Sequence, residues 1–277
     1  MQTFLTDVHN HSKFSFDGVD ILSDMLAAAQ KKGVAFYGVS EHFDADVAFY
    51  KKQPARLGDA ENYFHTARHL QEDYAGAMNV FVGCEFSYAD EAQVHAMYKD
   101  ICEKYRPDFI VNSVHTLCGD DYWDLQPFYD AAGKLRDKRE VYAEYLELIL
   151  KSLDAPYPYD ILGHIGYAPR YAPYEDKPLY YADHAAILDE ILKKVIAKDK
   201  ILEANAANFR LPEVRVLDEA VLRRYFALGG RKVSYASDAH STDSILRERG
   251  AITAFLKEVG FTHVTVPCRG EHIKIEL

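Results

Sequence analysis

The sequence has few cysteines, no long apolar run and fewer basic than acidic residues. Its four cysteines, Cys84, Cys102, Cys118 and Cys268, form no CxxC pair and are too sparse for a disulfide scaffold. No stretch approaches the roughly 18 apolar residues of a membrane span, and the N-terminal MQTFLTDVHN lacks the basic and apolar regions of a signal peptide. We therefore expect a cytoplasmic protein with no membrane partner, in which each cysteine is a small buried hydrophobic residue.

The charge balance is acidic, with 32 Lys and Arg against 43 Asp and Glu and a formal net charge of −11. A protein that binds the backbone of long nucleic acid needs a face rich in Lys and Arg to displace counterions. This composition therefore argues against a nucleic-acid partner. With only 10 prolines and 15 glycines, the chain also lacks the composition of a low-complexity region.

Short β-branched and aromatic runs alternate with longer stretches of helical periodicity along the 277 residues. Runs such as DFIVNSV and YDILGHI are apolar on both alternating faces, which favours a parallel sheet covered on both sides. No linker or composition shift divides the chain, so we predict a single α/β domain over residues 1–277 with a barrel-like count of seven strand–helix units.

The predicted strands and helices follow from this alternation. The strands are expected at 3–9, 34–41, 79–86, 108–114, 159–165, 200–206 and 232–238, and the ending TVPCRGEHIKIEL is expected to add one more short strand. The helices are expected at 22–32, 60–77, 91–105, 137–153, 183–198, 214–228 and 243–259. Long loops are predicted at 117–136 and 166–182, where the loops of a parallel barrel build its active face.

Histidines and acids recur where the predicted strands end. His9 and His11 in DVHNHSKFSFDG stand at i and i+2, so both imidazoles should leave the same face of the strand. In a parallel barrel the carboxyl ends of all strands converge on one mouth, where such groups would meet. The complete set is His9, His11, Asp17, His42, Glu85, His115, His164, Asp238 and His240.

A single histidine beside an apolar run is usually a structural side chain, but nine imidazoles and carboxylates buried together need a counter-charge. Divalent metal ions supply that charge, and nitrogen and oxygen ligands without thiolate suit catalytic Zn, Mn or Fe better than a structural zinc site. Nine ligands exceed the need of one ion that also keeps water, so two or three ions are indicated. Glu85 is expected to bridge two of them because it is the only glutamate in the set.

The motifs HNHSKFSFDG, SEHFD, GCEF and SDAHS, with the single histidines of NSVHT and LGHIG, resemble those of the PHP (polymerase and histidinol phosphatase) superfamily across nearly the whole chain. Within it they are most similar to the histidinol-phosphate phosphatase branch. The resemblance implies a distorted seven-stranded (β/α)7 TIM-like barrel and three divalent transition-metal ions. It implies a first ion held by His9, His11, Glu85 and Asp238, a second by Glu85, His115 and His164, and a third by Asp17, His42 and His240. Asp17 is a departure, because some relatives have histidine there.

The resemblance further implies a phosphomonoesterase that hydrolyses L-histidinol phosphate to L-histidinol and phosphate in histidine biosynthesis. A positively charged metal cluster suits a phosphate dianion, and the expected reaction is in-line attack on phosphorus by a hydroxide bridging two ions. Glu85, Asp238 and His240 are the expected catalytic residues. Arg170 and Arg210, in loops after the fifth and sixth strands, are expected to bind the substrate phosphate, because arginine can grip phosphate through two parallel hydrogen bonds.

Other functions stay open at this point. The rivals are a PHP phosphatase of another small phosphate ester or of phosphotyrosine, a PHP-type phosphodiesterase or exonuclease module, and an amidohydrolase. The acidic charge weighs against the nuclease module, and Glu85 stands where amidohydrolases often carry a bridging modified lysine.

HTARH at 65–69 is expected to be a solvated helix face, since Thr66 replaces the glutamate of a zinc-protease helix. The sequence gives no indication of an oligomeric state.

Overall fold

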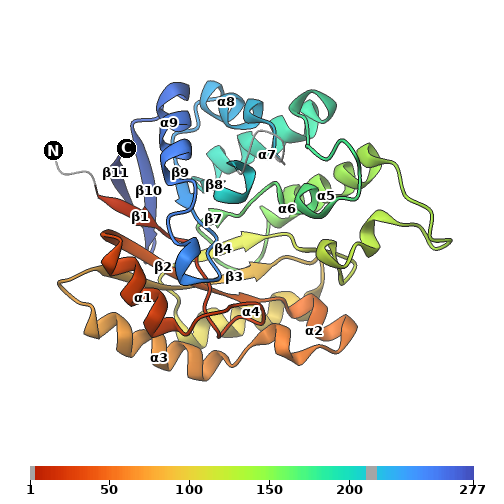
Figure 1. The fold of residues 1–277 in the computed structure, drawn as a ribbon. Helices are drawn as coiled ribbons and strands as arrows, with labels where there is room; N and C mark the ends of the chain where they lie inside the picture. Colours follow the sequence, from red (N-terminus) through yellow and green to blue (C-terminus); the bar gives the residue numbers. More distant parts are fainter. Residues whose placement is uncertain (1–3, 210–216) are drawn as a thin grey trace.

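The computed structural model describes residues 4–209 and 217–277, which contain a nearly closed barrel of seven parallel strands (Figure 1). Neighbouring strands follow one another along the chain, as in an α/β barrel with successive crossovers. The predicted fold class is therefore confirmed. In order the strands are β1 (Leu5–Asp7), β2 (Val34–Phe43), β3 (Asn79–Ser87), β4 (Ile110–Ser113), β7 (Ile161–Leu162), β8 (Ile201–Asn205) and β9 (Val233–Ala236).

Backbone hydrogen bonds join the segments that follow the first and last strands of the barrel. The Asp238 amide donates to the His9 carbonyl (3.0 Å), and the His11 amide donates to the Ala239 carbonyl (2.8 Å). Asp238 has a φ of 54°, a left-handed conformation that aspartate adopts more readily than most residues. The HxH and DxH motifs are thus held side by side by backbone hydrogen bonds.

Helices cover the outer face of the sheet, with α1, α3 and α4 on one side and α5, α7, α8 and α9 on the other (Figure 1). In α7 the buried residues Leu188, Ile191, Leu192 and Val195 have the spacing of one amphipathic face. The helices are α1 (Leu22–Lys31), α2 (Ala45–Lys51), α3 (Ala60–Asp73), α4 (Ala92–Tyr105), α5 (Lys138–Ser152), α6 (Tyr167–Tyr171), α7 (Ala185–Ala197), α8 (Glu219–Ala227) and α9 (Arg249–Val259).

Several predicted boundaries were wrong. β1 and β7 are shorter than the predicted strands, because the chain leaves the sheet to direct its polar side chains into the barrel mouth. Part of the helix predicted at 214–228 lies outside the described residues, and α9 begins six residues later than expected, after a 3-10 turn at Thr242–Ser244. The helices α2 and α6 were missed. The HTARH histidines are exposed on α3, as expected of a solvated face.

The C-terminal segment forms two strands instead of the predicted one. β10 (His263–Cys268) and β11 (Glu271–Glu276) pair antiparallel through a two-residue turn, in which Arg269 and Gly270 both have positive φ, as tight hairpins require. The Arg269 side chain donates to Asp108 (2.7 Å), which precedes β4. The hairpin is therefore fastened at the amino end of the barrel, opposite the histidine motifs.

An aromatic ring fills the barrel beneath the histidine motifs. A Cβ atom on Gly83 would lie 2.5 Å from the Phe109 ring, and one on Gly38 would lie 2.8 Å from it. Glycine at both positions therefore makes room for this ring inside the sheet. The barrel interior is thus apolar below and polar above, where Glu85 stands two residues beyond Gly83.

Candidate metal centre

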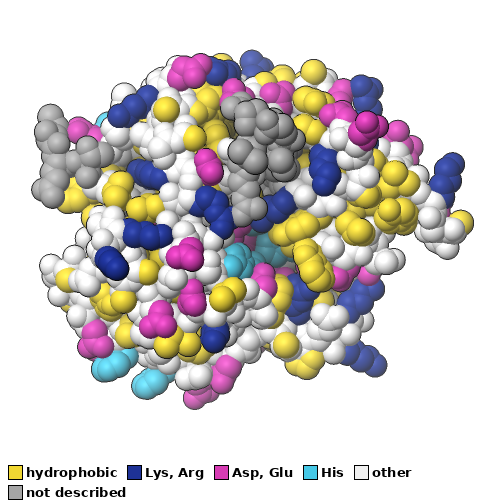
Figure 2. All heavy atoms as spheres, in the orientation of Figure 1, with side chains coloured by type: hydrophobic (Ala, Val, Ile, Leu, Met, Phe, Trp, Pro, Cys, Tyr) yellow, Lys and Arg dark blue, Asp and Glu magenta, His cyan; other side chains and the backbone are white. Residues whose placement is uncertain are grey.

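A cavity of about 350 Å³ opens where the parallel strands end. In Figure 2 histidine side chains lie at the bottom of a hollow in the middle of the face, next to basic side chains and a hydrophobic area. An adjoining cavity of about 500 Å³ shares Arg170, Asp238 and His240 and adds Ser244 and Arg247. The first cavity is lined by Phe16, Asp17, His42, Arg56, His115, Asp121, Trp123, His164, Tyr167, Arg170, Tyr171, Asp238 and His240. The predicted convergence of strand ends on one mouth is thus observed.

Glu85, which is fully buried in β3, is the centre of the cluster. Ser113 donates a hydrogen bond of 2.6 Å to its Oε1. Its other close neighbours are ring nitrogens of five histidines from four motifs. Oε2 lies near His42 Nδ1 (2.9 Å), His9 Nε2 (3.2 Å) and His11 Nε2 (3.5 Å), and Oε1 lies near His164 Nε2 (2.9 Å) and His115 Nε2 (3.1 Å). The expected common face of His9 and His11 is therefore observed.

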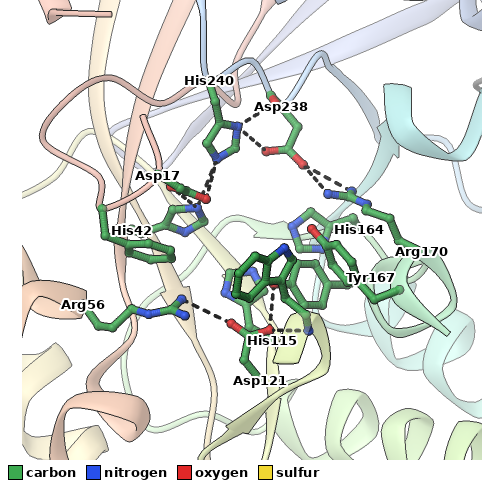
Figure 3. A pocket seen from close by; sticks show the side chains of 13 residues that line it. Asp17, His42, Arg56, His115, Asp121, His164, Tyr167, Arg170, Asp238 and His240 are labelled. Carbon is green, nitrogen blue, oxygen red and sulfur yellow. Dashed lines mark hydrogen bonds and ion pairs between the residues drawn. The ribbon is translucent and has the colours of Figure 1, made fainter. Parts of the chain in front are cut away.

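Asp238, Asp17 and His240 extend this cluster toward solvent. Asp238 Oδ1 lies 3.3 Å from His11 Nε2. Asp17 Oδ2 lies 3.3 Å from His240 Nε2, and its Oδ1 lies 3.6 Å from His42 Nε2 (Figure 3). The Asp17 side chain is 43% exposed, whereas Glu85 is completely buried. The structure therefore brings all nine predicted ligands together, with an inner and an outer part.

The residues present fit divalent cations. His9 Nε2, His11 Nε2, His42 Nδ1 and Glu85 Oε2 are all buried, and none has a hydrogen-bond partner among the described residues. Buried polar atoms are normally satisfied, so four atoms without hydrogen-bond partners gathered in one place fit the ligands of a cation. Four groups have ligand atoms within 4.8 Å of one another: His9, His11 and Asp238; His9, Glu85 and His164; His42, Glu85 and His115; and His11, His42 and His240. These rings are shared between groups, so the division into three sites stays a proposal.

Charges within the cluster shift the pKa values of its members in different directions. Burial lowers the pKa of His9, His42, His115 and His240, but the neighbouring carboxylates outweigh burial and raise it above the usual histidine value. Burial would raise the pKa of Glu85, but His9, His115 and His42 outweigh it and hold that pKa well below its usual range. Burial and the neighbouring His42 and His240 lower the pKa of His11 well below its usual value. Glu85 is therefore held as a carboxylate and His11 as a neutral imidazole, the forms that bind metal.

A second layer of carboxylates, missed in the sequence, orients these imidazoles. Glu203 Oε1 lies 2.5 Å from His9 Nδ1, and its Oε2 accepts a hydrogen bond from the His164 amide (2.7 Å). Asp44 Oδ1 lies 3.3 Å from His115 Nδ1. Carboxylates in this position fix the ring orientation and tautomer of a metal-binding histidine. Glu203 was detectable as the one acid within the apolar strand ILEAN.

Of the two arginines predicted to bind phosphate, only Arg170 lies among the described residues. Arg170 points into the cavity, where its Nη1 and Nη2 each lie 3.3 Å from Asp238 Oδ2 (Figure 3). Arg210 lies outside the described residues. Arg247, which was not predicted, lines the adjoining cavity, donates to Ser244 and forms no ion pair with a described carboxylate.

Within the described ranges, no helix combines the length and apolarity needed to cross a bilayer.

The sequence is similar to those of known histidinol-phosphatases. A probable histidinol-phosphatase of Clostridium acetobutylicum is 29% identical over 239 residues, covering 86% of this chain and 88% of that protein. A histidinol-phosphatase of Lactococcus lactis is 26% identical and covers 92% of this chain and 91% of its own.

The fold is also similar to solved structures. The crystal structure of the Lactococcus lactis histidinol phosphate phosphatase, complexed with zinc, L-histidinol and phosphate, matches with a TM-score of 0.82 and 26% identity, over 98% of this chain and 99% of that one. A putative histidinol phosphatase of Listeria monocytogenes, 20% identical with a TM-score of 0.74, covers 89% of this chain and 99% of its own and supports the fold alone. Residues 7–207 match the PHP domain family. This match covers well over half of the sequence, and the chain therefore belongs to the PHP domain family.

Proposed function

We propose that this protein is a histidinol-phosphatase, a phosphoric monoester hydrolase that converts L-histidinol phosphate to L-histidinol and phosphate. The observation that carries the proposal is the buried cluster of unsatisfied imidazole and carboxylate atoms around Glu85. It lies in a chain that matches, over nearly its full length, a phosphatase crystallised with zinc, L-histidinol and phosphate. This function agrees with the one expected from the sequence motifs.

The cluster would hold three divalent transition-metal ions, Zn, Mn or Fe, on the nine residues assigned above. When bound, such ions neutralise the buried carboxylates, polarise phosphoryl oxygens and lower the pKa of bound water to around 7. Because the acids lie at opposite ends of the cluster, with Glu85 buried and Asp17 partly exposed, the inner positions should hold their ions more tightly than the outer one. Second-layer contacts from Glu203 and Asp44 keep the imidazoles aimed at the centre.

The substrate phosphate would be bound on the side of the cavity that carries Arg170. Its guanidinium is held by Asp238 and by Asn205, whose Oδ1 lies 3.4 Å from Nη2, so its direction into the cavity is fixed. A fixed guanidinium can form two parallel hydrogen bonds to a phosphate group. Glu85, Asp238 and His240 remain the proposed catalytic residues, and residues 1–277 the proposed single domain.

The test is a panel of phosphate esters assayed with the metal-loaded protein. The panel contains L-histidinol phosphate, phosphotyrosine, a simple alkyl phosphate and a phosphate diester. We expect kcat/KM for histidinol phosphate to exceed that of every other ester by at least roughly tenfold, since buried polar groups discriminate strongly against partners that leave them unpaired. A higher kcat/KM for phosphotyrosine or for the diester would contradict the proposal.

A further inference from the structure

The two sides of the cavity differ in charge. On one side Arg170 lies against Asp238, near His240; on the opposite side lie Arg56 and Asp121 (Figure 3). There the guanidinium of Arg56 pairs with two carboxylates. Its Nη1 lies 3.2 Å from Asp121 Oδ2 and 3.4 Å from Asp44 Oδ2. Two acids against one arginine leave this side with an excess negative charge, where a cationic group would be stabilised.

Of the two acids, Asp121 lines the cavity together with Arg56. Asp121 is only 2% exposed and is presented by the short hairpin of β5 (Thr116–Leu117) and β6 (Asp120–Asp121). Its Oδ1 accepts hydrogen bonds from the Trp123 amide (2.9 Å) and the Tyr167 hydroxyl (3.0 Å). Burial and the nearby charge of Asp44 raise the pKa of Asp121, so a further cation at this carboxylate would relieve an unfavourable environment.

This carboxylate is one side chain away from the metal cluster. The Tyr167 ring that contacts Asp121 packs on His115 with ring centroids 4.5 Å apart. Asp44, which shares Arg56 with Asp121, contacts the same imidazole. A phosphate bound at the cluster would leave its ester substituent in the cavity that Asp121 lines.

Flat apolar surfaces stand beside this acid at the cavity mouth. Phe16 and Trp123 both line the cavity, and 39% and 61% of their surfaces are exposed. The Arg56 guanidinium lies 3.8 Å over the Phe16 ring, which fixes both groups. The region thus combines an anion with aromatic faces, the surroundings that suit a molecule with an ammonium group and a planar ring.

We infer that Asp121 is a specificity-determining residue that accepts a hydrogen bond from the ammonium group of the substrate. The inference rests on the proposed function. In histidinol phosphate the ammonium group is on the carbon next to the ester carbon, and the imidazole ring lies one carbon further on. The ammonium would reach Asp121 while the ring packs on the exposed Trp123, since Arg56 and His42 already lie against the Phe16 ring.

The experiment compares histidinol phosphate with its deamino analogue, 3-(imidazol-4-yl)propyl phosphate, in the wild type and in Asp121→Asn. Asparagine keeps the shape and the Oδ1 acceptor for Trp123 and Tyr167 but removes the charge. We expect wild type to prefer histidinol phosphate in kcat/KM, and Asp121→Asn to reduce that preference by about 10- to 100-fold with little change for the analogue. Asp124→Asn, an exposed acid of the same loop, is the matched control and should keep the wild-type preference.

Binding of the alcohols gives a second measurement that does not depend on turnover. Calorimetry should show that Asp121→Asn weakens the binding of L-histidinol by a similar factor, while the binding of 3-(imidazol-4-yl)propan-1-ol is unchanged. Equal losses for both phosphate esters would assign Asp121 a purely structural role and overturn the inference. Equal kcat/KM of wild type for both esters would overturn the inference alone, whereas no hydrolysis of either would overturn the proposed function and the inference with it.

Discussion

Glu85 and Asp108 are both buried carboxylates in the same barrel, but their surroundings are opposite. Asp108, at the amino end of the strands, is 2% exposed and fully satisfied. It accepts hydrogen bonds from Arg68 (2.6 Å), Arg269 (2.7 Å), Gln71 (2.8 Å) and the Val82 amide (2.9 Å). Glu85, at the carboxyl end, is surrounded by imidazoles, and its Oε2 has no hydrogen-bond donor among the described residues.

This difference separates a structural acid from a functional one. Asp108 joins α3, β3 and the C-terminal hairpin, and its charge is already matched by arginines. Glu85 and the rings around it have buried atoms without hydrogen-bond partners among the described residues, as the ligands of a cation would. Burial alone therefore does not identify a site in this protein, whereas several buried imidazole and carboxylate atoms without hydrogen-bond partners, gathered in one place, do.

Removing the charge of Glu85 should have the largest effect. Glu85→Gln keeps the size of the side chain but removes the charge and replaces one carboxylate oxygen with an amide nitrogen, which cannot bind a cation. We expect kcat/KM to fall on the order of 10³-fold, together with the metal content measured by elemental analysis. Glu190→Gln, on the exposed face of α7, is the control. Unchanged metal content in the Glu85 variant would remove this residue from the centre of the site.

Glu203→Gln should have an intermediate effect, because Glu203 orients His9 and supports the His164 backbone without reaching the centre. We expect a loss of metal affinity or kcat/KM of about 10- to 100-fold. Titration with zinc in a competitive chelator assay measures the affinity directly. Activity restored by excess metal would support an orienting role, while a loss that no metal concentration restores would argue that Glu203 acts in the reaction itself.

Asp108→Asn should have the smallest effect on activity, with kcat/KM changed less than about threefold because Asp108 lies at the other end of the barrel. It should lower the free energy of unfolding by about 1–3 kcal/mol through weakened charge-assisted hydrogen bonds. Burial raises the pKa of Asp108, but Val82, Arg269 and Arg68 outweigh it and lower that pKa below its usual value.

The pH dependence sharpens this prediction. Because the folded-state pKa of Asp108 is lowered, its contribution is complete above the ordinary aspartate pKa of about 3.9 and is lost as pH falls through the folded-state value. Urea unfolding should therefore show a difference between Asp108→Asn and wild type that is constant near neutral pH and shrinks under acid. A difference that grows under acid would contradict this account.

The residues of the cluster could be predicted from sequence because each lies near or beyond the carboxyl end of a strand, and parallel strands end at one mouth. His9 and His11 lie two residues apart, and Glu85 pairs in register with His42 on the neighbouring strand. The rest depends on the conformation of loops. Asp121 and Arg56 are 65 residues apart, and their contact exists only because the β5–β6 hairpin returns toward the loop after β2. No local periodicity encodes such a contact.

The most direct test of the account is the metal content of wild-type protein purified without chelator. We expect elemental analysis to find about three divalent transition-metal ions per chain, and removal of these ions to abolish phosphatase activity until Zn, Mn or Fe is restored. Full hydrolysis of histidinol phosphate by protein that contains no stoichiometric transition metal would contradict the central claim.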